Sequence, residues 1–168
     1  MQGSATLALL AEVFIALAGF TGIVAALGQR SAGAWRPVDV IRFRAMLESS
    51  LAGLLIAIVP FGCFYIGVPE SLTWRAGSAL LIVYAWSIII RTVHKRRQLR
   101  ATADPDFVPG AHLTIMIGAI PVSAALLMNA AGTSLVPAFG GYLIGLLFLL
   151  VLDCTMFVLL LRFIRAET

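Results

Sequence analysis

Asp153 is the residue of this sequence best placed to do chemistry, because it is a lone carboxyl group inside a long apolar segment. From Pro137 to Leu161 the chain carries no other charged residue. An apolar helix of this length spans a bilayer core of ~30 Å at ~1.5 Å per residue. An unpaired carboxylate at that depth costs at least ~2.5 kcal/mol, and such groups often mark ion or proton pathways. The alternative is a structural role, in which a protonated carboxyl group hydrogen-bonds to a neighbouring helix.

Glu12 is a second acidic residue inside an apolar segment, and it lies in the opposite half of the membrane from Asp153. Helical spacing places Glu12 on one face with Ala16, Gly19 and Ile23, so we expect its side chain to point into the helix bundle. The two carboxyl groups are therefore candidate stations of one proton or cation path. A polar contact between helices is the alternative role for Glu12.

Glu48 and His112 are expected just inside the inner membrane surface. Glu48 follows Arg44 by four residues, which allows an ion pair within one helix and favours structural anchoring. His112 opens an apolar segment, where a polar anchor at the interface is the simplest interpretation. Alternatively, the two residues join Asp153 in an inner polar cluster, with the imidazole titrating near neutral pH.

The same residue types could bind a metal ion, with Cys154 as a fourth ligand, but they show no recognised ligand spacing. We therefore expect no metal site and no cofactor. The sequence also contains no nucleophile–base motif, no glycine-rich phosphate loop and no HExxH motif, so the chain is not expected to be an enzyme. A lipid-modifying enzyme built on Glu48, His112 and Asp153 is the least favoured hypothesis.

The elements that must position these groups are membrane-spanning helices. Of the 168 residues, 61% are hydrophobic and 12% are charged, whereas soluble domains average ~25% charged residues. The apolar segments predict five transmembrane helices over about 5–27, 45–66, 72–90, 110–131 and 137–161. These use up the chain, so we predict an all-α bundle forming a single integral membrane domain over 1–168. An interfacial lead-in from Pro37 is expected before the second span, and a cytoplasmic extension after the third.

Basic residues predict the orientation of the chain. Eleven of the twelve Lys and Arg residues fall on one side, in the 1–2 and 3–4 connections and after the fifth span. The positive-inside rule therefore predicts an outside N-terminus and a cytoplasmic C-terminus, in a plasma membrane of the bacterial inner-membrane type. Residues at the span ends are predicted to anchor the protein to lipid: Trp35, Trp74, Arg91, Lys95, Arg96, Arg97 and Arg100. The basic cluster among them is expected to attract anionic lipid, not nucleic acid.

Small residues at four-residue spacing predict close helix packing. Ala18 and Gly22 provide one such pair, and Gly141 and Gly145 provide another. The contacts could lie within one chain or between subunits. Membrane lipids and either further copies of the chain or other membrane subunits are therefore the expected partners.

Two functions fit these observations. The first is a small channel or secondary transporter, oligomeric, that moves protons or small cations past the intramembrane carboxyl groups. The second is a non-catalytic accessory or assembly subunit of a larger membrane complex. The buried carboxyl groups favour transport, because they cost energy that a pure scaffold has less reason to spend.

Overall fold

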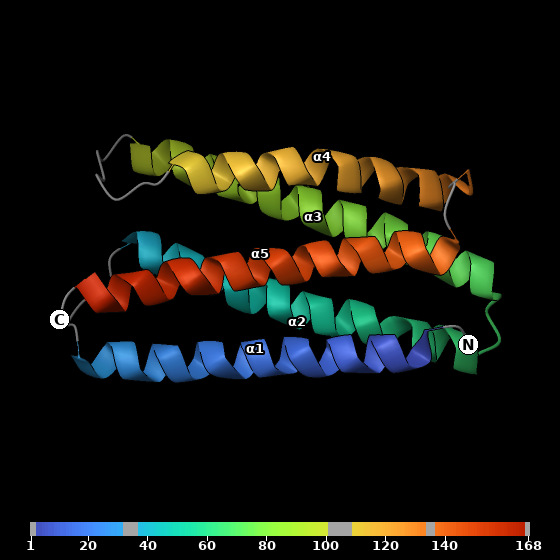
Figure 1. Cartoon of the computed structure of the whole chain (residues 1–168), viewed down its shortest axis with the longest axis horizontal. Helices are drawn as coiled ribbons and strands as arrows, with labels where there is room; N and C mark the ends of the chain where they lie inside the picture. The colour runs from blue at the N-terminus through green and yellow to red at the C-terminus, as the bar shows by residue number, and fades with distance from the viewer. Residues whose placement is uncertain (1–2, 32–36, 101–108, 134–136, 167–168) are drawn as a thin grey trace. The chain divides into compact units, whose positions relative to one another are not determined.

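The computed structural model describes residues 3–31, 37–100, 109–133 and 137–166, and these residues form five helices and no strand. Figure 1 labels the helices, with colours that follow the chain from the N-terminus to the C-terminus. Their bounds are Ser4–Ser31 (α1), Pro37–Tyr65 (α2), Glu70–Arg100 (α3), Pro109–Ala131 (α4) and Ala138–Ala166 (α5). The predicted all-helical fold is therefore confirmed, and α2 begins at Pro37, where proline suits the first helical turn.

Four of the helices contain segments long and apolar enough to cross a membrane. The segments are Ser4–Val24, Val40–Tyr65, Glu70–Arg91 and Ala138–Val158. In α4 the described apolar part, Ile117–Ala131, is shorter, and the side chains of 109–116 lie outside the described residues. The predicted span over about 110–131 therefore stays a prediction.

Residue contacts divide the chain into two compact units, which are described separately. The first unit comprises Met1–Glu70 and Leu146–Thr168, and the second comprises Ser71–Gly145. The first unit thus contains α1, α2 and most of α5, whereas the second contains α3, α4 and the first turns of α5. In Figure 1, α1 and the first-unit part of α5 run in the same direction, and α2 runs in the opposite direction.

Close packing in the first unit depends on a glycine. The Phe14 ring of α1 is fully buried against Gly53 of α2, where an added Cβ atom would lie 2.5 Å from the ring. Lipid-embedded helices lack a strong water-exclusion force between them, so small residues that let backbones approach are favoured at their contacts. Phe20 and Phe157 provide a second contact, between α1 and α5, with ring centroids 6.4 Å apart.

Aromatic rings fill the core of the second unit. Trp74 packs edge-on against Phe139, with ring centroids 5.2 Å apart, and its ring centroid lies 5.5 Å from that of Tyr142. The Tyr142 ring lies over Gly77, where a Cβ atom would come within 2.6 Å of it. The start of α5 is thereby fixed to α3.

Two helices end in the same glycine-based motif. Gly67 after α2 and Gly132 after α4 adopt positive φ angles of 82° and 75°. The next residues, Val68 and Thr133, donate backbone hydrogen bonds to carbonyls five positions earlier. This pattern is the Schellman motif, which satisfies the free carbonyl groups at a helix end.

Candidate functional site

The first unit contains a buried polar cluster centred on Asp153, which is 0% exposed. Ser49 Oγ donates a hydrogen bond to Asp153 Oδ1. Ser50 Oγ donates to Asp153 Oδ2 at 2.9 Å. Each carboxyl oxygen therefore has its own hydroxyl partner, and both hydroxyls come from α2. We call Asp153, Ser49 and Ser50 the carboxyl cluster.

Consecutive serines can reach both oxygens because of helical geometry. Neighbouring residues on a helix project ~100° apart, so Ser49 and Ser50 approach the carboxyl group from its two sides. Both serines are buried, and their short side chains bring the hydroxyls close to the α2 backbone. Among the described residues, no Lys, Arg or His pairs with Asp153, and its hydrogen-bond partners there are the two serine hydroxyls.

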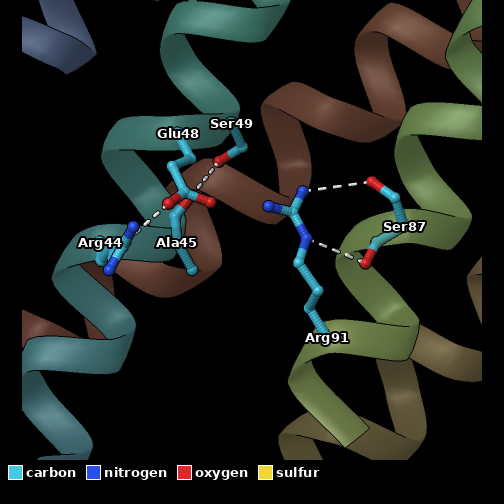
Figure 2. A network of polar contacts seen from close by, with 6 residues as sticks. All are labelled: Arg44, Ala45, Glu48, Ser49, Ser87 and Arg91. Atoms are coloured by element: carbon cyan, nitrogen blue, oxygen red, sulfur yellow. Dashed lines mark hydrogen bonds and ion pairs between the residues drawn. The ribbon is translucent and has the colours of Figure 1, made fainter. Parts of the chain in front are cut away.

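Ser49 has more acceptors than hydrogens. Its Oγ also lies 2.8 Å from the carbonyl oxygen of Ala45 and 3.2 Å from that of Met46. Figure 2 shows the bond to Ala45. A serine hydroxyl carries one hydrogen and can accept through its lone pairs. The hydroxyl can therefore point either to Asp153 or back to its own helix, which leaves it free to accept a hydrogen bond from the carboxyl group.

Glu48 lies beside this cluster in sequence, but its side chain forms an ion pair with Arg44. The Nε atom of Arg44 lies 2.7 Å from Oε1 of Glu48, within the same helix (Figure 2). The predicted intrahelical pair is therefore confirmed. The side chain of Glu48 is 39% exposed, so this contact resembles a surface ion pair.

Glu12 occupies a different position from the one expected. Its side chain is exposed on α1 instead of pointing into the first unit, and it makes no hydrogen bond or ion pair with another described residue. The helical face that does point inward carries Leu7, Leu10 and Phe14. Of these larger apolar side chains, Phe14 packs against Gly53 of α2. The side chain of His112 lies outside the described residues, so the proposed inner cluster with Glu48 and Asp153 stays a hypothesis.

The predicted lipid anchors have different placements. Trp74 is 3% exposed and packs in the core of the second unit, whereas a lipid-facing anchor was expected. Arg91 is exposed and donates through Nε and Nη2 to the carbonyl oxygen and the hydroxyl of Ser87, one turn earlier (Figure 2). Trp35 and the side chains of Lys95, Arg96, Arg97 and Arg100 lie outside the described residues.

The predicted packing residues also divide into two groups. Gly141 and Gly145 are buried, and added Cβ atoms would come within 2.8 Å of Asn129 and 2.9 Å of Leu126. Gly22 has no neighbouring atom within 4 Å of such a position, and Ala18 is half-buried. Close packing therefore occurs at the α5 pair, whereas Gly22 faces outward from the first unit.

The second unit has a buried polar cluster of its own, built on an amide. Asn129 is 1% exposed, and its Nδ2 atom donates to Ser78 Oγ at 2.7 Å and to the carbonyl oxygen of Ala138 at 2.8 Å. We call these three groups the amide cluster. It ties α3, α4 and the start of α5 together. Arg75 adds a cap, because its Nε and Nη2 atoms donate to the last carbonyls of α4, on Ala130 and Ala131.

Sequence reasoning selected Asp153 but assigned no role to the hydroxyl and amide partners. The one signal for the carboxyl cluster was the Ser49-Ser50 pair, set in the first half of an otherwise apolar helical segment. A serine within a membrane helix commonly bonds its own backbone, so the pair alone did not indicate a long-range partner. Ser78 and Asn129 carry still less signal, since each is a single polar residue.

Within the described part of the chain, no group of three or more His, Cys, Asp or Glu side chains could hold a metal ion. Comparison of the chain with protein-family models, curated proteins and solved structures gave no match. Function must therefore be argued from the carboxyl cluster.

Proposed function

We propose that the protein is a small channel or secondary transporter that moves protons or small cations through the membrane past Asp153. The observation that carries this proposal is the complete burial of Asp153 in an apolar helix with two neutral hydroxyl partners. A group that only joined helices would not need to be ionisable. Ionisable groups inside a membrane often mark ion and proton pathways.

The amide cluster strengthens this argument from within the same chain. Asn129 joins helices through hydrogen bonds and has no ionisable group. An asparagine at position 153 could accept from Ser50 and donate to Ser49 in much the same way. Hydrogen bonds that hold α2 and α5 together therefore do not require a carboxyl group. The carboxyl group adds the ability to bind and release a charge.

We further propose that the chain crosses the plasma membrane five times, with its N-terminus outside and its C-terminus in the cytoplasm. The support is the length of the helices together with the concentration of basic residues on one side. The start of α1 and the end of α5 lie at opposite ends of the first unit (Figure 1), as an odd number of spans requires.

The test is ion flux in proteoliposomes that contain the native protein or Asp153→Asn. We expect proton or cation flux in the native protein and a loss of at least tenfold in the variant, with folding intact. An ionophore added at the end of each trace verifies that the vesicles are sealed. Flux that is the same for both proteins would remove Asp153 from the path, and no flux for any common ion would refute transport.

A role as an accessory or assembly subunit is the second candidate, and the exposed face of α1 favours it. Glu12 is exposed there without a described partner, and Gly19 and Gly22 have open space around them. A carboxyl group facing lipid is costly, so another helix that covers it would be stabilised. Co-purification of the native chain in fixed stoichiometry with other polypeptides would support this function, whereas a purely homomeric particle would contradict it.

A further inference from the structure

The ion that the carboxyl cluster binds could be a proton or a metal cation such as Na⁺, and the geometry of the cluster distinguishes the two. We propose that it binds a proton and excludes Na⁺, with Ser49 as the hydroxyl that reorients when the proton binds. For its physiological meaning this inference rests on the proposed function. The chemistry of the site is nevertheless testable without any transport.

The contacts in the cluster leave no central position for a metal ion. Its four side-chain oxygens are the two of Asp153 and one each from Ser49 and Ser50. Each hydroxyl is bonded directly to a carboxyl oxygen, at 2.9 Å for Ser50, so a hydrogen atom occupies the space between them. Hard cations are held by about six or more oxygens directed at one point. Inserting one here would break both serine bonds and still leave its coordination incomplete.

A proton, in contrast, can be added without leaving any hydrogen unpaired. In the ionised state both serines donate to Asp153. In the neutral state the added proton is on Oδ1 and is donated to Ser49 Oγ, while the Ser49 hydroxyl turns to the carbonyl oxygen of Ala45, 2.8 Å away. Ser50 continues to donate to Oδ2. The change consists of one new O–H bond and one hydroxyl rotation.

Besides Asp153, the described charged side chains of the first unit are Glu12 on α1, Arg42, Arg44 and Glu48 on α2, and Glu70 at the start of α3, and Arg42 is half-buried. On α2, Glu48 pairs with Arg44. On α1, Glu12 is on the exposed face, and on α5 the neighbouring Cys154 is exposed as a free thiol. Among the described residues of this unit, Ser49 and Ser50 are the groups that hydrogen-bond to Asp153.

Infrared difference spectroscopy of the full chain in lipid vesicles tests the proposal. The spectra follow the carbonyl stretch of a protonated carboxyl group while the pH is lowered. The titrations are run in Na⁺ and in a large organic cation at equal ionic strength. We expect a band that is absent in Asp153→Asn and whose titration midpoint is the same in both media.

A midpoint that falls by about one pH unit for each tenfold rise in Na⁺ would show direct competition and overturn the proposal. The absence of any band dependent on Asp153 would also overturn it. Flux is measured separately on the same vesicles. A normal proton band without flux would refute the proposed transport function while supporting the proton site.

Ser49→Ala tests the role of the hydroxyl. Because the variant removes the group that accepts from the protonated carboxyl group, we expect the band to shift in frequency and its midpoint to change. Thr21→Val is the matched control, since Thr21 is a buried hydroxyl of the same unit that bonds to the carbonyl of Leu17 in its own helix. An unchanged band in Ser49→Ala, or an equal shift in Thr21→Val, would exclude Ser49 as the reorienting hydroxyl.

Discussion

The two units of the molecule solve the same problem with different chemistry. Each buries one polar side chain that joins helices, namely Asp153 in the first unit and Asn129 in the second. Both side chains bond to serine hydroxyls from another helix. The two residues are similar in size, but the amide carries two N–H donors, whereas the carboxyl group can gain or lose a proton.

The difference between the two clusters shows that neutral hydrogen bonds are enough to hold helices together, whereas an ionisable group is more than packing requires. The amide cluster uses its two hydrogens to join Ser78 and the carbonyl of Ala138, and every bond is made between neutral groups. The carboxyl cluster makes as many contacts between helices but retains a charge-bearing group in an apolar setting. Substitutions that exchange or weaken the two clusters should therefore separate helix cohesion from ion chemistry.

The largest loss of stability is expected for Asn129→Asp. In the native protein the Nδ2 atom of Asn129 lies 2.8 Å from the carbonyl oxygen of Ala138. The substitution replaces this donor with a carboxyl oxygen, so two acceptor oxygens face each other. An unsatisfied buried polar group costs ~1–3 kcal/mol. Asp153→Asn, which keeps a partner for each serine, should cost less than ~1 kcal/mol. Unfolding in mixed micelles measures both, and an equal cost would contradict the distinction between the clusters.

Gly141→Ala should have a slightly smaller effect on the amide cluster. Its new methyl group would lie 2.8 Å from Cγ of Asn129, and overpacking of this kind typically costs ~1–3 kcal/mol. Gly140→Ala is the matched control, because no atom lies within 4 Å of its Cβ position. There the better helix propensity of alanine should leave stability equal or higher by up to ~1 kcal/mol. Thermal unfolding should show a loss of stability for Gly141→Ala and none for Gly140→Ala, and an equal loss in both variants would argue against the described packing.

Ser50→Ala should have a smaller effect than Asn129→Asp or Gly141→Ala. The variant removes one hydroxyl donor from Asp153 Oδ2 but leaves Ser49 in place. The net loss for one hydrogen bond is ~1 kcal/mol, and more where the partner is charged. The ionised state should lose more than the neutral state, so stability should fall more at high pH than at low pH. A loss independent of pH would indicate that Ser50 contributes to packing alone.

The sequence was sufficient for most of the fold because long apolar segments have few alternatives in a membrane. It identified the helical segments, the helix that begins at Pro37, and Asp153 as the central residue. It could not place Glu12 on the exposed face of α1, because the small residues beside it fit either a buried or an outward contact. It also missed the burial of Trp74, since tryptophan favours both membrane interfaces and protein cores. The partners of Asp153 depend on the register between α2 and α5, which single-helix patterns do not contain.

The most direct test of the central claim measures proton flux and unfolding on the same samples of Asp153→Asn and Ser78→Ala. The first substitution alters the ionisable group of the carboxyl cluster, and the second removes a hydroxyl from the amide cluster. We predict that Asp153→Asn loses flux by at least tenfold with nearly native stability. Ser78→Ala should lose ~1 kcal/mol of stability and retain flux. Native flux in a well-folded Asp153→Asn protein would contradict the account.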